Sequence, residues 1–231
     1  MILLAVETAT EWCSVALWRD GEVSSLERRA GNRQGEFVLP MLESLLKSAR
    51  LGMRDVQGIA YGAGPGAFTG LRIACGVAQG LAFARSLPVI GVSTLEATAE
   101  ESGGERVIVA LDARMHEVYY AAFEKHAGAW MSKLPECCVA PDAVDIPDGD
   151  DWLGCGSGFA VYRDRLVPRL APRIVPTCGR IAPEVRPSAV AVARLAAPRF
   201  EAGLGGDASQ AVPNYIRDKV AFTTFERTGD R

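Results

Sequence analysis

The sequence contains few of the residues that commonly bind catalytic metals. Its only histidines are His116 and His126, ten positions apart, so there is no H-x-x-x-H pair. Zinc peptidases and histidine-held iron sites need such a pair, and this chain therefore lacks their ligands. The cysteines form no C-x-x-C pair, and two of them are adjacent, which suits neither zinc ligation nor a disulfide framework. The six cysteines are Cys13, Cys75, Cys137, Cys138, Cys155 and Cys178.

The sequence also lacks a strong charge excess and a long hydrophobic segment. Its formal net charge is only -3, which gives no general attraction to nucleic acid. Basic clusters at 28–29 and 163–173 are balanced by acidic residues, and we interpret them as solvated surface. The apolar run Met1–Leu4 soon reaches Glu7 and is too short for a signal peptide or a membrane span. We expect a cytoplasmic protein without membrane contact.

The residues that are present predict an α/β fold. Hydrophobic residues make up 48% of the 231-residue chain, enough for one large domain or two small ones. Asp20-Gly21 is a strong hairpin signal between two strands, and the apolar spacing changes to a helical period from Phe37 onward. Ser93 and Glu96 have the capping-box spacing for a helix that begins near Thr94. The expected strands lie at about 2–7, 13–19, 22–29, 56–61 and 88–92, with helices at about 37–49, 70–86 and from Thr94.

The second half of the chain repeats the theme of the first. A buried strand at 106–111 ends at Asp112 and is followed by a partner strand at 117–124, as the first strand ends at Glu7. This repetition predicts two related subdomains, and Ser102-Gly103-Gly104 breaks the pattern between them. We place the N-terminal subdomain at 1–102 and a smaller C-terminal subdomain at 103–231. Further helices are expected at 157–167 and 187–197.

One candidate site is the turn between the first two strands. Glu7, Thr8 and Thr10 combine an acid with small hydroxyl residues, as in the phosphate-binding hairpins of sugar kinases and actin- or Hsp70-type ATPases. A working site would need a second acid across a cleft, and Asp112 could supply it. The alternative is that the two threonines only satisfy backbone groups of the turn.

A second candidate is the glycine-rich segment Gly62–Arg72. Glycines allow tight turns with exposed amides, and the start of the following helix favours anions. The segment is not a Walker A loop, because no Lys-Ser/Thr pair follows its last glycine, and it lacks the dinucleotide G-x-G-x-x-G spacing. Its other interpretation is a tight turn from strand to helix, with Thr69 as the N-cap.

The helix after this segment is unusually rich in small residues. Glycine inside a helix costs on the order of 1 kcal/mol relative to alanine, so Gly76 and Gly80 need a compensating reason. Close approach of another helix is one, and composition does not decide between internal packing and a subunit interface. We expect Ala78→Arg to block association without unfolding the protein. The small residues are Ala74, Gly76, Ala78, Gly80, Ala82 and Ala84.

Taken together, these segments resemble the TsaB family, also called YeaZ, a branch of the glycoprotease-like ATPase-fold superfamily. The resemblance covers ordered blocks from residue 2 to about 217. The most specific are G-P-G-A-F-T-G-L-R at 64–72 and D-A-R-M-H-E-V-Y at 112–119. The others are L-A-V-E-T-A-T-E at 4–11, C-S-V-A-L at 13–17, L-P-M-L at 39–42, V-S-T-L-E-A at 92–97 and P-N-Y-I-R at 213–217.

The resemblance implies two ribonuclease-H-like subdomains and a non-catalytic scaffold for N6-threonylcarbamoylation of adenosine 37 in tRNA. The implied partners are TsaD, which carries the metal-binding histidines and transfers the threonylcarbamoyl group, and the ATPase TsaE. A homodimer is expected for the chain alone, with tRNA contacted only through the complex. No intrinsic cofactor is implied, although ATP or ADP could bind at the complex interface. The interface residues we expect are Gly64, Pro65, Phe68, Thr69, Arg72, Ala74, Ala78 and Leu81.

Two departures from the family pattern concern the candidate cleft. Glu7 stands where the family usually has aspartate, and 33–36 lacks a histidine that is common there. The longer acid weakens the case for a magnesium site, so Glu7, Thr8, Thr10 and Asp112 are expected to form a vestigial nucleotide cleft. A stand-alone kinase or ATPase of the same fold is the alternative function. A peptidase has only the family's naming history behind it.

Overall fold

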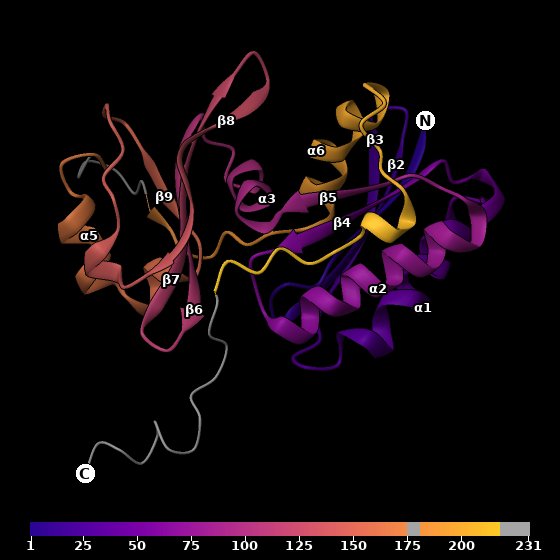
Figure 1. Ribbon diagram of the computed structural model, residues 1–231, viewed down its shortest axis with the longest axis horizontal. Coiled ribbons are helices and arrows are strands. Elements are labelled where there is room, and N and C mark those ends of the chain that lie inside the picture. The colour runs from indigo at the N-terminus through magenta and orange to yellow at the C-terminus, as the bar shows by residue number, and fades with distance from the viewer. Residues whose placement is uncertain (175–180, 218–231) are drawn as a thin grey trace, which may run out of the picture.

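A computed structural model describes residues 1–174 and 181–217 of the chain. These residues form two lobes, each built on a five-stranded mixed sheet with flanking helices (Figure 1). The expected α/β class with two ribonuclease-H-like lobes is therefore confirmed. Cys178 and the last part of the expected second subdomain, 218–231, lie outside the described residues.

The first sheet has the strand order β3-β2-β1-β4-β5. The hairpin strands pair antiparallel, whereas β4 and β5 add in parallel to β1. The observed ends of these strands lie within a few residues of the predicted ones. β4 extends further than predicted, into the glycine-rich segment that was expected to be a loop. The strands are β1 (Ile2–Glu7), β2 (Trp12–Arg19), β3 (Glu22–Arg29), β4 (Gly58–Gly64) and β5 (Val89–Ser93).

The second sheet repeats this topology. Its order is β10-β9-β6-β7-β8, so β6, β7 and β8 form an antiparallel meander, and β9 and β10 add in parallel to β6. The segment after β8 holds only the short 3₁₀ turn η2 (Pro141–Ala143), where the first lobe has a long helix. The strands are β6 (Arg106–Arg114), β7 (Glu117–His126), β8 (Ala129–Val139), β9 (Leu153–Cys155) and β10 (Ile181–Ala182).

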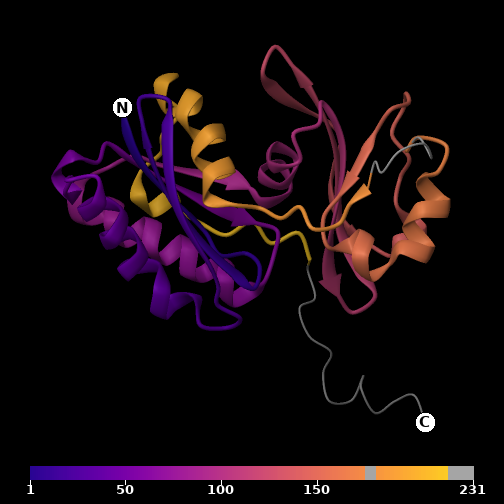
Figure 2. The ribbon, with the colours of Figure 1, turned by 180° about the vertical axis from the view of Figure 1, so that it is seen from behind.

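Helices cover both faces of both sheets (Figures 1 and 2). In the first lobe, α1 (Gln34–Ser48) and α2 (Phe68–Arg85) lie on one face, and α6 (Ala189–Glu201) covers the other. α3 (Thr94–Glu101) packs on the second sheet, between the lobes. The far face of the second sheet is covered by α4 (Gly158–Val161) and α5 (Arg163–Leu170). The short 3₁₀ turns η1 (Met53–Asp55) and η3 (Ala208–Gln210) are the remaining elements of the described residues.

The helices predicted in the second half exist with changed ends. The one expected at 157–167 is divided into α4 and α5, with Tyr162 between them. The one expected at 187–197 is α6, whose Ser188 hydroxyl caps the start by accepting from the Ala191 N–H. Its buried alanines pack on Ala5, Ala16 and Ala60 of the first sheet. The chain thus returns to the first lobe, and our division at 102 and 103 stays a prediction.

The orientation of α2 corrects one expectation. Ala74 and Ala78 are fully buried against the first sheet, together with Leu71 and Ala82. They do not lie on an exposed face, because the helix turns Ala74, Ala78 and Ala82 toward the strands, whereas Ala84 is exposed. Gly76 and Gly80 lie on the outside, where a Cβ atom would have no described neighbour within 4 Å.

Among the described residues, no helix is long and apolar enough to span a membrane.

Ala78→Arg should therefore unfold the protein rather than test an interface. It forces a long cation into a fully buried position, which should cost more than about 3 kcal/mol of unfolding free energy. Gly80→Arg is the matched control on the outer face and should keep or raise stability, by up to about 1 kcal/mol from helix propensity. Urea unfolding followed by circular dichroism measures both. Equal stability of the two variants would contradict this orientation of α2.

Candidate functional site

A pocket of about 440 Å³ lies between the two lobes. Thr10 from the β1–β2 turn and Asp112 from β6 both line it, so the structure brings together two of the four predicted cleft residues. The loop between β4 and α2 contributes Gly66 and Ala67 to the same wall. Its other polar lining residues are Glu11, Asn32, Gln34, Arg114, Tyr119 and Ser157.

Glu7 does not face this pocket. Its side chain is buried beneath β4, and its Oε1 accepts a 2.6 Å hydrogen bond from the Ala9 N–H. Its Oε2 has no hydrogen-bond partner among the described residues and lies over Gly62, where a Cβ atom would come within 1.9 Å of it. Burial raises the pKa of Glu7 to about 7, against the effect of the Ala9 and Thr8 N–H groups. The carboxyl is therefore a buried group of β1 without access to a ligand.

Thr8 is enclosed in the same way. Its hydroxyl is buried and donates a 2.7 Å hydrogen bond to the carbonyl oxygen of Gly70. The first turn of α2 comes so close that a Cβ atom at Gly70 would stand 1.9 Å from the Thr8 carbonyl oxygen. Thr8 thus satisfies a backbone group, which is the structural alternative considered for this turn.

Asp112 reaches the pocket, but its oxygens already have partners. Oδ1 accepts from the Arg114 N–H at 2.8 Å and from the Tyr162 hydroxyl at 3.2 Å. Oδ2 pairs with the Arg114 guanidinium at 3.0 Å. Within residues 1–174 and 181–217, no three His, Cys, Asp or Glu side chains gather so that they could hold a metal ion. The predicted partners Glu7 and Asp112 thus do not meet across the cleft, because Glu7 is buried away from it.

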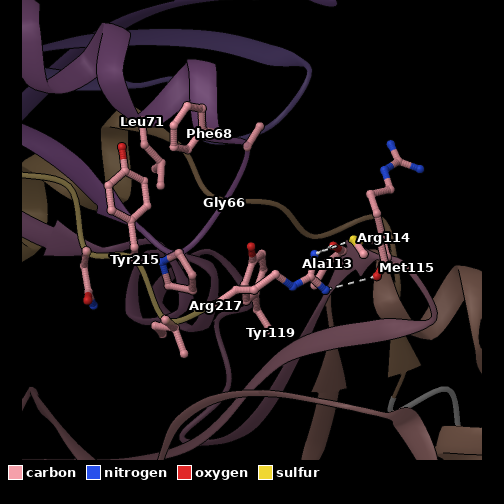
Figure 3. Close-up of a pocket in the computed structure, with 13 residues that line it drawn as sticks. Gly66, Phe68, Leu71, Ala113, Arg114, Met115, Tyr119, Tyr215 and Arg217 are labelled. Atoms are coloured by element: carbon pink, nitrogen blue, oxygen red, sulfur yellow. Dashed lines mark hydrogen bonds between the residues drawn. The ribbon is translucent and has the colours of Figure 1, made fainter. Parts of the chain in front are cut away.

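A second pocket of about 360 Å³ adjoins the first and is more apolar (Figure 3). The two share Gly66, Ala67, Ala113, Arg114 and Tyr119 as a common wall. The remaining lining comes from the β4–α2 loop, α2, the β6–β7 turn and the C-terminal segment. These residues are Pro65, Phe68, Leu71, Met115, Asn214, Tyr215, Ile216 and Arg217.

The predicted interface residues fall into three groups. Phe68, Thr69 and Arg72 are exposed on the first turn of α2, and Leu81 is partly buried. Gly64 and Pro65 are buried beside the C-terminal segment. Ala74 and Ala78 belong to the core, as described above. The structure thus makes the first three available for contact with another molecule, while the interface itself stays a prediction.

The contacts of Tyr215 with α2 and of Arg217 with the second lobe were not predicted from the sequence. The Tyr215 ring stacks on Phe68 with centroids 5.4 Å apart, and its hydroxyl accepts from Arg72 Nε at 3.0 Å. Arg217 binds the β6–β7 turn of the other lobe. The P-N-Y-I-R block was the available signal, but its contacts lie about a hundred or more positions away along the chain.

The family model for TsaD, tRNA N6-adenosine threonylcarbamoyltransferase, matches residues 28–224. The tRNA threonylcarbamoyladenosine biosynthesis protein TsaB of Escherichia coli K12 is 35% identical over 96% of this chain and 97% of its own length. The TsaB of Haemophilus influenzae is 37% identical over 70% of this chain and 74% of its length. The solved structure of YeaZ from Pseudomonas aeruginosa has a TM-score of 0.84 at 39% identity, covering 93% of this chain and 99% of that one.

The repeated strand order and the helices between the lobes define the class: an α/β protein of the actin- and Hsp70-like ATPase fold. Within that class, the full-length similarity is to proteins named TsaB or YeaZ. The chain belongs to the TsaB family.

Glu7→Gln should change how stability depends on pH. The folded-state pKa of about 7 lies above the ordinary 4.5, so the folded protein binds the proton more tightly. The contribution of Glu7 to the free energy of unfolding is therefore fully present below pH 4.5, and it is lost as the pH rises toward 7. The variant does not titrate here, so its stability relative to the native protein should rise by about 2 kcal/mol between pH 5 and pH 8.

Urea unfolding at several pH values measures this difference. Glu11→Gln removes an exposed carboxylate from the same turn and is the matched control for the loss of a side-chain charge. A pH-independent difference for Glu7→Gln would show that its carboxyl titrates normally in the folded protein.

Proposed function

We propose that this chain is the non-catalytic accessory subunit of tRNA N6-threonylcarbamoyladenosine synthesis. It acts with the transferase TsaD and the ATPase TsaE on adenosine 37 of tRNAs that read codons beginning with A. Support comes first from relatives named as TsaB biosynthesis proteins over nearly the full chain. A role in tRNA modification also agrees with a cytoplasmic location.

The outer face of α2 is the observation that carries the proposal. Gly76 and Gly80 each weaken the helix by about 1 kcal/mol relative to alanine, and neither position touches a described residue that would compensate. Phe83 is 81% exposed at one end of this face, and Phe68 is 40% exposed at the other. Small residues between exposed aromatic rings suit close packing against a helix of another chain. We assign this face to TsaD, and to a second copy when the chain is alone.

The histidines support a non-catalytic role. His116 lies in the β6–β7 turn, just before β7 begins, and His126 is the last residue of that strand. The two therefore stand at opposite ends of β7, and His126 pairs with Glu124 at 3.2 Å. They cannot share one metal ion, so we assign the metal-dependent transfer to TsaD. The net charge of -3 likewise favours tRNA binding through the complex.

Association with TsaD is tested by size-exclusion chromatography with light scattering. We expect the purified chain and TsaD to elute as a heterodimer at micromolar concentration, and to form threonylcarbamoyladenosine with TsaE. Gly80→Arg should remain folded and weaken association at least tenfold, because it places a long cation where a helix must approach closely. The amount of threonylcarbamoyladenosine formed should decrease as association with TsaD weakens.

Ala160→Arg is the matched control, because it adds the same charge at an exposed helical position of the other lobe. It should leave association and product formation unchanged. Separate elution of the native chain and a competent TsaD would reject the partnership. Normal association of Gly80→Arg would instead show that the partner uses another face.

A stand-alone ATPase or kinase is the alternative function. The inter-lobe pocket with Asp112 on its wall is the observation in its favour. Against it, the Asp112 carboxylate is occupied by Arg114 and Tyr162, and Glu7 and Thr8 are buried behind the pocket. ATP or ADP at this position would, in our proposal, need groups from the partner.

We therefore expect the isolated chain to show no magnesium-dependent ATP turnover. Phosphate release from ATP, measured with the native chain and with Asp112→Asn, should be the same as without protein. Turnover by the native chain that Asp112→Asn abolishes would establish the alternative.

A further inference from the structure

The segment Ala211–Arg217, here called the strap, connects the two lobes after the chain has returned to the first one. It runs beside β4 in the first lobe, where the Val212 N–H donates to the Tyr61 hydroxyl at 3.0 Å and the Asn214 N–H donates to the Ala63 carbonyl at 2.6 Å. It then crosses toward β6 (Figure 1). Backbone hydrogen bonds therefore fix its path along the first lobe before it reaches the second.

Tyr215 attaches the strap to the first turn of α2. Its ring is stacked on Phe68, and its hydroxyl accepts the Arg72 Nε hydrogen at 3.0 Å. The Arg72 guanidinium in turn lies 3.7 Å from the centre of the Phe68 ring. The three side chains form one cluster that is open to solvent, since Phe68 is 40% and Tyr215 42% exposed. A molecule that contacts this turn of α2 would therefore also meet the strap.

Arg217 attaches the other end of the strap to the second lobe (Figure 3). Its guanidinium donates to the carbonyl oxygens of Ala113 at 2.8 Å and Arg114 at 3.2 Å, and forms an ion pair with Glu117. The side chain is only 11% exposed. The Arg217 side chain thus bonds to residues before and after the β6–β7 turn, and it holds the backbone of that turn in place.

The turn that Arg217 holds has an uncommon backbone. Arg114, Met115 and His116 are consecutive and all left-handed, with φ of 61°, 53° and 62°. A non-glycine residue in this region costs on the order of 1 kcal/mol, and such residues persist only where the surroundings fix them. The Asp112 carboxylate holds the turn from the pocket side, through Arg114. Loss of Arg217 would leave it without the hydrogen bonds from the strap.

We propose that the strap couples the exposed first turn of α2 to the β6–β7 turn at the inter-lobe pocket. Contact with Phe68, Tyr215 and Arg72 sets the position of the strap, and Arg217 transmits that position to Arg114. Because Arg114 and Ala113 line both pockets, the shape of the cleft then depends on what touches α2. This coupling is a property of the chain itself and does not depend on the identity of the partner.

Hydrogen–deuterium exchange of the isolated chain tests the coupling. In Arg217→Ala, peptides covering 112–118 should exchange about tenfold faster, because the turn loses its charged hydrogen bonds. Tyr215→Ala should produce a similar acceleration in the same peptides, although Tyr215 contacts α2 rather than the turn. Tyr215→Phe keeps the stacked ring without the hydroxyl and should give a smaller increase.

Val212→Ala is the matched control within the strap, since this side chain is 61% exposed and the strap's bonds to Tyr61 use its backbone. It should leave the 112–118 peptides unchanged, and peptides of β1 report that each variant is still folded. Acceleration in Arg217→Ala but in neither Tyr215 variant would overturn the proposal, because the turn would then be held locally. No change in Arg217→Ala, or an equal change in Val212→Ala, would overturn it as well.

Discussion

The close approach of the glycine-rich segment to the β1–β2 turn is the constraint on which the rest of the structure depends. Gly62 passes over the buried carboxyl of Glu7, and Gly70 lies against the Thr8 carbonyl, both at distances that no side chain would allow. This contact fixes the start of α2 against the sheet. It also encloses the side chains of Glu7 and Thr8, so that neither reaches the pocket between the lobes. The glycines that suggested an anion site therefore bring the protein's own backbone against these two residues.

Because of this position, the two faces of α2 have different roles. Its inner alanines allow the backbone to lie close to the strands, and its outer glycines leave a narrow surface between exposed aromatic rings. The second lobe contributes a pocket wall on which the Asp112 carboxylate is already paired with Arg114. In the proposed function, this protein gives its partner a shaped surface, and the partner provides the reactive groups.

Much of the fold could be predicted from the sequence, because the signals for its elements lie in residues close together along the chain. Examples are the apolar runs of the strands and the Asp20-Gly21 turn. The repeated acid at a strand end correctly indicated two similar sheets. The orientation of α2 could not be predicted, since alanine and glycine occur at nearly every second position and carry no clear helical phase. The contacts of Tyr215 and Arg217 were also beyond prediction, because they join segments a hundred or more positions apart.

The return of α6 to the first lobe has a consequence for how the protein is made. One face of the first sheet remains open until Ala189–Glu201 has been synthesised, because the alanines of α6 are its cover. The second sheet, by contrast, draws all its strands from a continuous stretch between β6 and β10. During translation the second lobe can therefore be completed first, although its synthesis begins later, and the first lobe closes only after α6 has left the ribosome.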